Sequence, residues 1–399
     1  MKYDFNNAID RTGCSAIKID GTAVKDSLGL NFYEDSIPMW IADMDFPVAP
    51  AITNALIDRV SRATFGYTDF SDEYFDTIIK WYNRRLGMQF TKEEIVHSNG
   101  TLTALRNIIR AFTSENNGVI IQPPVYYPFK SIISECGRTV IENKLFVDDQ
   151  NNYFIDFEDF ELKCSDPNTK LFIFCNPHNP IGQIWNKNDA ARLLEICNKH
   201  NVLFFSDEVH ADIVRKEHTF ISSLNLNNHK GLIVATAANK TFNLAGLEIT
   251  NLVIPDACIR EKYNKYIGEN SITPIAMTAS IAAYSLCEDW VNEMNSVIDE
   301  NVAYLKEFLS VNLPKVRFNA PAGTYLAWLD FRAYNLSEEE LLKTLSDKAH
   351  VIVEGGTMFG KDSIGFTRMN LACPKQTLVD ALNKIHTIFK GPSKNSPSL

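Results

Sequence analysis

The amino-acid sequence predicts an α/β protein in which a mostly parallel sheet lies between helices and a smaller α+β domain follows. Strand and helix patterns alternate in the middle of the chain, which is typical of a parallel sheet covered on both faces. After Trp290 the pattern changes to helices and strands in mixed order. The chain has 399 residues, 45% of them hydrophobic, so it is long enough for two domains.

In the larger domain, short apolar runs predict strands at 119–122, 171–175, 202–206 and 231–236. Apolar residues recur at helical spacing from Asn188 to His200, which predicts a helix between two of these strands. Residues 259–287 form a longer helical pattern. A break is expected near Pro274, because proline removes a backbone donor from the helix.

The smaller domain is expected to begin with a helix that ends near Leu309. The elements expected after it are a strand at 325–330, a helix near 338–348, strands at 350–353 and 366–371, and a closing helix at 376–389. The tail, residues 391–399, has the composition of a disordered segment.

Three of the expected strands lead to polar side chains that belong together chemically. The strand near 171–175 leads to Asn179, the next strand to Asp207, and the third to Lys240. Parallel strands end at one edge of a sheet, so an amide, a carboxylate and an amine are expected to meet there. Pyridoxal phosphate needs this set: the amine forms a Schiff base, the carboxylate keeps the pyridine nitrogen protonated, and the amide donates to the phenolic oxygen. Taken singly, these residues are commonly a surface lysine, a helix cap and a turn, so the prediction depends on their combination.

Longer motifs extend this prediction over nearly the whole chain. The motifs are Met39–Phe46, Phe65–Thr68, Pro123–Phe129, Lys240–Asn243 and Phe366–Pro374. With them the chain resembles the pyridoxal-phosphate-dependent aminotransferase superfamily of fold type I. Within that superfamily it resembles the MalY/PatB family of cystathionine β-lyases, which are carbon–sulfur (C-S) lyases. The resemblance implies that residues 1–48 join the small domain, that 49–288 form the large cofactor-binding domain, and that 289–390 form the small domain.

A glycine turn before a helical pattern predicts where the cofactor phosphate binds. The segment Ser98–Thr103 opens the helix, so the backbone N–H groups around Gly100, Thr101 and Leu102 are expected to face the phosphate dianion. An ordinary helix N-cap by Ser98 or Asn99 explains the same residues, and both interpretations can hold together.

The resemblance also implies roles around the cofactor ring. Tyr126 is expected to stack on the pyridine ring, and Tyr127 to lie near the substrate's proton chemistry. His210 stands where aminotransferases commonly carry tyrosine, and it is expected to contact the cofactor. Lys240 has two expected roles, because it holds the cofactor and its released amine can remove the Cα proton of the substrate. Burial beside a cationic cofactor is expected to lower its pKa.

Other residues are implied to bind the substrate and a second subunit. Arg368 resembles the clamp on the substrate α-carboxylate, since a guanidinium matches a carboxylate with two parallel hydrogen bonds. Ile41 and Asn179 are expected as further substrate contacts. Tyr67 resembles the residue that reaches the cofactor phosphate of the partner subunit, which implies a homodimer with shared active sites.

Two residues depart from the family pattern. Asn239 precedes Lys240 where relatives usually have serine, and Glu248 follows it by eight positions where relatives have arginine, lysine or glutamine. A carboxylate facing the phosphate would repel it. Either Glu248 points elsewhere, or other donors balance the phosphate charge.

The expected reaction is α,β-elimination on a sulfur amino acid such as L-cystathionine or another cysteine S-conjugate, a small amino-acid substrate. An aminotransferase would use the same residues and remains the alternative. Some relatives bind regulators, so a protein partner is a third possibility, although the intact Lys240, Asp207 and Asn179 argue against a purely structural role. A metal site built from Asp207, Glu208, His210 and Asp212, with His178 or His218, is not expected, because no HExxH-like or facial-triad spacing supports it.

Bulk properties exclude several other classes. A net charge of −10 argues against a nucleic-acid-binding role. The eight cysteines are scattered, which favours reduced thiols in the cytoplasm. No apolar signal segment or membrane span is expected from the sequence.

Overall fold

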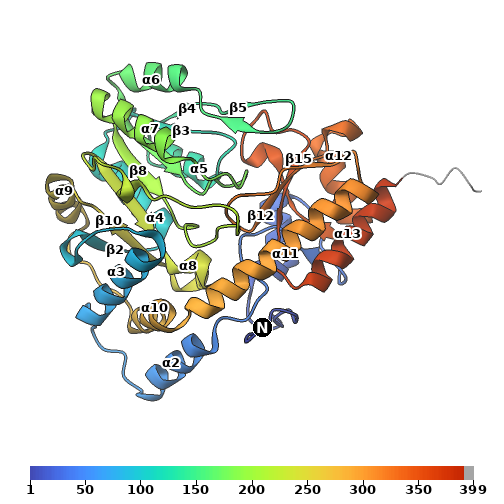
Figure 1. The fold of residues 1–399 in the computed structure, drawn as a ribbon, viewed down its shortest axis with the longest axis horizontal. Helices are drawn as coiled ribbons and strands as arrows, with labels where there is room; N and C mark the ends of the chain where they lie inside the picture. Colours follow the sequence, from blue (N-terminus) through green and yellow to red (C-terminus); the bar gives the residue numbers. More distant parts are fainter. Residues whose placement is uncertain (391–399) are drawn as a thin grey trace, which may run out of the picture.

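The chain is built around two sheets, which lie side by side with helices around them (Figure 1). The computed structural model describes residues 1–390, so the predicted disorder of 391–399 falls outside the described residues. The larger sheet has seven strands in the order β2-β10-β9-β8-β7-β3-β4, and the smaller has four in the order β11-β12-β15-β14. The predicted α/β fold class is confirmed. No helix in the described part of the chain is long and apolar enough to cross a membrane.

The larger sheet is mostly parallel, as predicted. Its strands are β2 (Ile95–Asn99), β3 (Gly118–Ile121), β4 (Thr139–Glu142), β7 (Thr169–Cys175), β8 (Leu203–Asp207), β9 (Leu232–Thr236) and β10 (Ile249–Val253). The four strand pairs from β4 to β9 are parallel. Strand β10 runs antiparallel to both of its neighbours and was not predicted. The connection from β9 to β10 contains only the four-residue helix α8 (Ala238–Thr241) and a 3-10 turn, whereas a parallel crossover usually carries a full helix.

Helices cover both faces of the larger sheet. They are α3 (Asp72–Leu86), α4 (Thr101–Phe112), α5 (Pro128–Glu135), α6 (Phe157–Ser165), α7 (Lys187–His200), α9 (Ala257–Ile267) and α10 (Pro274–Leu286). Helix α2 (Pro50–Ser61) lies farther out and packs on α10 (Figure 1). Alternate strand residues pack on opposite faces: Leu171 and Ile173 lie with α4, α5 and α9, whereas Phe172 and Phe174 lie with α6 and α7. The predicted helical stretch 259–287 is interrupted before Pro274, where a new helix begins, as expected.

The smaller sheet contains β11 (Arg317–Phe318), β12 (Leu326–Asp330), β14 (Glu354–Gly355) and β15 (Phe366–Asn370). Helices α11 (Glu288–Asn312), α12 (Glu338–Lys343) and α13 (Lys375–Phe389) accompany it, and a π-helical turn continues α12 to Lys348. The strand expected at 350–353 is shorter than predicted. This strand, β13 (Val351–Ile352), pairs in parallel with β1 (Ile37–Pro38) in a separate two-stranded sheet. The N-terminal segment also meets β15, because the Asn370 N–H donates to the Met39 carbonyl at 2.8 Å. The domain boundaries at residues 48, 288 and 390 stay predictions.

Candidate active site

The three predicted strand ends lie next to one another at one edge of the larger sheet. Strands β7, β8 and β9 are neighbours, and their register places Cys175 beside Asp207 and Asp207 beside Ala235. Asn179 follows β7 and Lys240 follows β9, as the sequence predicts. A cavity of about 300 Å³ opens here. Its lining includes Ala42, Asn99, Gly100, Thr101, Leu102, Thr103, Tyr126, Cys175, Asn179, Asp207, His210, Asn239, Lys240 and Glu248.

One end of the cavity is an uncapped helix N-terminus. Gly100 precedes α4 with φ +91°, a backbone conformation that side-chain-bearing residues rarely adopt, and no side chain caps the helix. Ser98 instead donates to the carbonyl of Gly100, so the simple N-cap interpretation is wrong. The N–H groups of the first turn are left free at the positive end of the helix dipole. They fit a phosphate dianion.

The buried charges of Asp207 and Lys240 favour binding of a cationic group in the cavity at the strand ends. Burial raises the pKa of Asp207 to about 6, although the Val209 N–H and the Lys240 amine act in the opposite direction. Burial also lowers the pKa of Lys240, and the Arg368 charge adds to this effect. A protonated pyridine nitrogen beside Asp207 would provide the buried carboxylate with an opposite charge.

Two polar side chains in the lining have unused hydrogen-bonding capacity. The Nδ1 atom of His210 is buried and has no hydrogen-bond partner within residues 1–390. Burial lowers the pKa of His210 to about 3, so its ring is neutral at physiological pH. Asn179 accepts a hydrogen bond at Oδ1 from Arg368 Nη1 at 2.9 Å, which leaves its amide nitrogen as a donor for a ligand. The residues present therefore fit pyridoxal phosphate.

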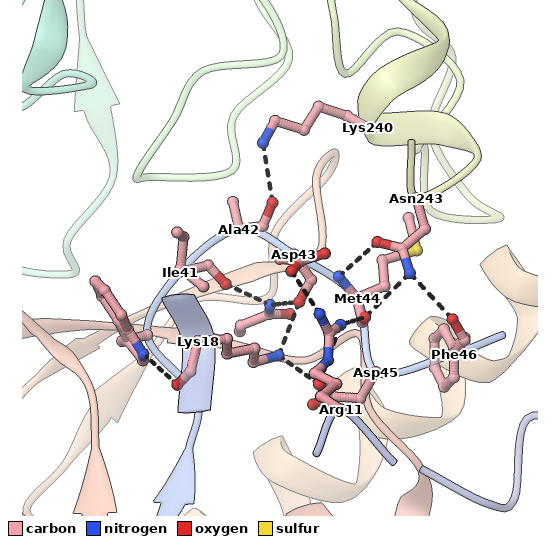
Figure 2. A network of polar contacts seen from close by, with 12 residues as sticks. Arg11, Lys18, Ile41, Ala42, Asp43, Met44, Asp45, Phe46, Lys240 and Asn243 are labelled. Atoms are coloured by element: carbon pink, nitrogen blue, oxygen red, sulfur yellow. Dashed lines mark hydrogen bonds and ion pairs between the residues drawn. The ribbon is translucent and has the colours of Figure 1, made fainter. Parts of the chain in front are cut away.

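The Lys240 amine contacts the N-terminal segment, which the sequence did not predict. Its Nζ atom donates to the Ala42 carbonyl at 2.9 Å, and Figure 2 shows this contact. The Tyr325 hydroxyl donates to the same carbonyl at 3.1 Å. Ala42 lies in the Met39–Phe46 motif. The motif indicated that this segment matters for function, but it did not indicate that the Ala42 carbonyl contacts Lys240.

Arg368 lies in a second unpredicted contact, with Glu354. The two residues are cross-strand partners on β15 and β14, both are buried, and their side chains form an ion pair. Burial raises the pKa of Glu354, while the Arg368 charge lowers it. The guanidinium also lies over the Phe359 ring, with 4.8 Å to the centroid. The one feature of the sequence that could have indicated this ion pair is a glutamate placed directly after the apolar run 351–353.

Of four other residues predicted to bind the cofactor or the substrate, only Tyr126 lines the cavity in this subunit. Tyr126 lines the cavity, whereas the Tyr127 ring packs edge-on against Phe359, 5.8 Å away, on the Arg368 side. Ile41 does not line the cavity, and its carbonyl accepts a hydrogen bond from Asn370. Tyr67 is fully exposed and lines a separate hollow.

The two departures from the family pattern have different environments. Asn239 accepts a hydrogen bond at Oδ1 from the Ile249 N–H at 3.2 Å, so it stabilises the turn into β10. Glu248 has φ +48° and lines the cavity on the side of Gly100. It therefore does not point away from the region where the free N–H groups of α4 lie.

The residues weighed for a metal site serve other contacts. Glu208 accepts hydrogen bonds from Ser206, Ser222 and Ser223. His178 is buried between the Pro124 carbonyl and the Trp185 indole. Over residues 1–390, no three His, Cys, Asp or Glu side chains are grouped so that they could hold a metal ion.

An α/β fold with this amine, carboxylate and amide at the strand ends is typical of the fold type I class of enzymes that use pyridoxal phosphate. The chain matches the family "Aminotransferase class I and II" over residues 34–385, and it belongs to that family. Cystathionine beta-lyase PatB of Bacillus subtilis is 39% identical over 387 residues, which cover 96% of this chain and 98% of that protein. Protein MalY of Escherichia coli is 29% identical, covering 94% and 96%.

Solved structures agree with the sequence relatives. Cystalysin from Treponema denticola, which contains pyridoxal 5'-phosphate, has a TM-score of 0.91 at 31% identity, covering 98% of this chain and 99% of that one. A pyridoxal-phosphate-bound C-S lyase from Staphylococcus hominis has a TM-score of 0.90 at 32% identity, covering 97% and 98%. The predicted fold type and family are confirmed.

Proposed function

We propose that this protein is a pyridoxal-phosphate-dependent C-S β-lyase. It cleaves L-cystathionine or a related cysteine S-conjugate and, with one water, releases a thiol, pyruvate and ammonia. The observation that carries this proposal is the full-length match to a cystathionine β-lyase by a chain that also places Lys240, Asp207 and Asn179 around one cavity.

The chain's own residues account for cofactor binding. The free N–H groups of Thr101 and Leu102 at the start of α4 would hold the phosphate, and Lys240 would hold the cofactor covalently. Asp207 would bind the pyridine nitrogen, while Asn179 and His210 would contact the cofactor near its phenolic oxygen. When bound, the cofactor supplies a ring that takes up the negative charge left on Cα.

The residues proposed to bind and deprotonate the substrate include Arg368 and Lys240. Arg368 binds the α-carboxylate, and its bond to Asn179 links the carboxylate site to the cofactor site. The Lys240 amine removes the proton from Cα, because its lowered pKa keeps it in the neutral form more readily. Tyr127 is proposed to act near the substrate, because its ring packs on Phe359, over which the Arg368 guanidinium lies. Ile41 is proposed as a substrate contact through its place next to Ala42 in the Met39–Phe46 motif, although its side chain does not line the cavity. With the cofactor bound, loss of the Cα proton would allow the thiolate to leave Cβ.

An assay of products tests this function directly. Purified holoenzyme is mixed with L-cystathionine without any keto acid, and pyruvate, ammonia and thiol are measured. Equal amounts of all three are expected. If turnover requires a keto acid and no pyruvate forms, the enzyme is an aminotransferase instead.

The proposed functional unit is a cytoplasmic homodimer with shared active sites. Tyr67 has no role within its own subunit's cavity, and its hollow includes Asn99, next to the start of α4. Ile57, Val60 and Phe65 are also exposed nearby in the sequence, and they supply apolar area for a partner. In such a dimer Tyr67 would donate to the phosphate in the neighbouring subunit.

A further inference from the structure

The segment Met39–Phe46, which we term the strap, is held by an asparagine three residues after Lys240. Asn243 accepts a hydrogen bond at Oδ1 from the Met44 N–H at 3.1 Å. Its Nδ2 donates to the carbonyls of Met44 at 3.1 Å and Phe46 at 3.0 Å. Figure 2 shows these bonds converging on the strap below Lys240. Asn243 has φ +59°, a conformation that asparagine tolerates better than most residues.

A second asparagine holds the strap from the smaller sheet. Asn370 lies on β15, two residues after Arg368, and is buried. Its Nδ2 donates to the carbonyls of Ile41 at 2.8 Å and Asp43 at 2.9 Å. These two carbonyls flank Ala42 on either side. The Asn370 side chain therefore fixes the peptide units that orient the Ala42 carbonyl.

Charged residues of the N-terminal segment hold the outer side of the strap. Arg11 pairs with Asp43 at 2.8 Å and also contacts the Met44 carbonyl. Lys18 pairs with Asp45 at 2.8 Å and donates to the Asp43 carbonyl at 2.7 Å. These contacts leave the strap little freedom to shift without breaking several hydrogen bonds (Figure 2).

We propose that Asn243 and Asn370 are positioning residues for Lys240, which they place by clamping the strap between the two sheets. The strap presents the Ala42 carbonyl to the lysine amine, so the base is aimed by a peptide group and not by another side chain. Asn370 and the carboxylate-binding Arg368 share one strand, and Asn243 follows Lys240 by three residues, just beyond the end of α8 (Ala238–Thr241). The strap therefore links the substrate carboxylate site to the catalytic base.

The chemistry of proton removal explains why this link matters. Before it accepts the Cα proton, the Lys240 amine must keep a lone pair aimed at Cα. A hydrogen bond from one N–H to the Ala42 carbonyl fixes the remaining directions of the nitrogen. After proton transfer the same carbonyl stabilises the ammonium. A displacement of about 1 Å at such a group lowers the rate by roughly a hundredfold.

Asn243→Asp and Asn370→Asp test the proposal in the holoenzyme. Each variant keeps the size and the Oδ1 acceptor but loses the donors to the strap carbonyls. The measurement is exchange of the Cα hydrogen of L-alanine with D2O, followed by NMR. The inference rests on one part of the proposed function, namely that Lys240 removes the Cα proton. Exchange of the Cα hydrogen of L-alanine does not require elimination of a thiol. A failed lyase assay therefore leaves this test intact.

Asn301→Asp is the matched control. Asn301 is fully buried, and its Nδ2 donates to the carbonyls of Leu371 at 3.0 Å and Cys373 at 2.8 Å, directly after Asn370, without contacting the strap. We expect both strap variants to slow Cα exchange roughly ten- to a hundredfold. We also expect faster amide hydrogen exchange over residues 39–46, measured by mass spectrometry. The control is expected to stay within about twofold of the wild type in both measurements.

Either of two results overturns the proposal. One is a wild-type rate of Cα exchange in either strap variant, and the other is an equal loss in Asn301→Asp, which would mean that local destabilisation is the cause. If Asn243→Asp does not fold, Asn243→Gly replaces it, because glycine tolerates the positive φ and removes the whole side chain.

Discussion

Arg368 Nη1 donates a hydrogen bond to Asn179 Oδ1 at 2.9 Å, across 189 residues of sequence. Arg368 lies on β15 of the smaller sheet, and Asn179 follows β7 of the larger sheet. This single bond joins the residue proposed to bind the substrate α-carboxylate to a residue proposed to bind the cofactor. The two sheets therefore meet at the point where substrate and cofactor would react.

Arg368→Lys should weaken substrate binding selectively. Lysine keeps the charge that compensates the buried Glu354, so the fold should persist, but it cannot make two parallel hydrogen bonds to a carboxylate. We expect the KM for amino-acid substrates to rise about tenfold or more, while the visible absorption of the bound cofactor stays normal. An unchanged KM would assign the carboxylate to another residue.

Lys240→Ala should bind the cofactor without a covalent bond. Turnover should fall by several orders of magnitude, because the variant loses both the covalent attachment and the base. In the wild type, reduction with borohydride followed by peptide mapping should place the cofactor on Lys240. A label on any other lysine would contradict the assignment.

Asp207→Asn should stabilise the cofactor-free protein at alkaline pH while it reduces activity. Burial raises the pKa of Asp207 from 3.8 to about 6, so the folded state binds more protons than the unfolded state between these values. The free energy of unfolding therefore falls as pH rises through this window, by on the order of 2–3 kcal/mol. Thermal unfolding should show a gain for the variant at pH 8 and a smaller gain at pH 5. Equal gains at both pH values would contradict the linkage.

Glu248→Gln should tighten cofactor binding. Glu248 lines the cavity on the side where α4 would hold the phosphate, and its carboxylate opposes that dianion. We expect the Kd of the cofactor to fall about two- to tenfold at low ionic strength. Because Glu248 is exposed, salt should reduce the difference between variant and wild type. An unchanged Kd at low salt would show that Glu248 lies too far from the phosphate to matter.

Tyr67→Phe should weaken cofactor binding roughly ten- to a hundredfold, the effect of one hydroxyl-to-phosphate hydrogen bond. Hybrid dimers with Lys240→Ala subunits test whether Tyr67 acts across the interface. If it does, one site of each hybrid carries both changes and the other carries neither, so activity exceeds that of either parent. If Tyr67 acts within its own subunit, each site carries one change and mixing restores nothing.

The sequence by itself determined the parts of the site that depend on local pattern. Asn179, Asp207 and Lys240 each follow an apolar run, and the alternation of strands with helices implies parallel neighbours whose ends meet. Gly100 before a helical pattern likewise predicted free N–H groups at a helix start. These inferences need only the spacing of apolar residues, which identifies strands and helices, and the chain direction, which identifies the end of each strand.

Tertiary structure alone decided which distant groups complete the site. Ala42 and Lys240 are separated by 198 residues, and the atom that meets the lysine is a backbone carbonyl that every residue type possesses. Glu354 faces Arg368 only through the register of β14 with β15, and a shift of one residue would turn it to the other face. The apolar residues of β10 would suit a parallel strand as well as the antiparallel strand that the structure shows, so they do not indicate its direction. Contacts of this kind depend on the packing of whole elements, because local propensity does not encode register or long-range pairing.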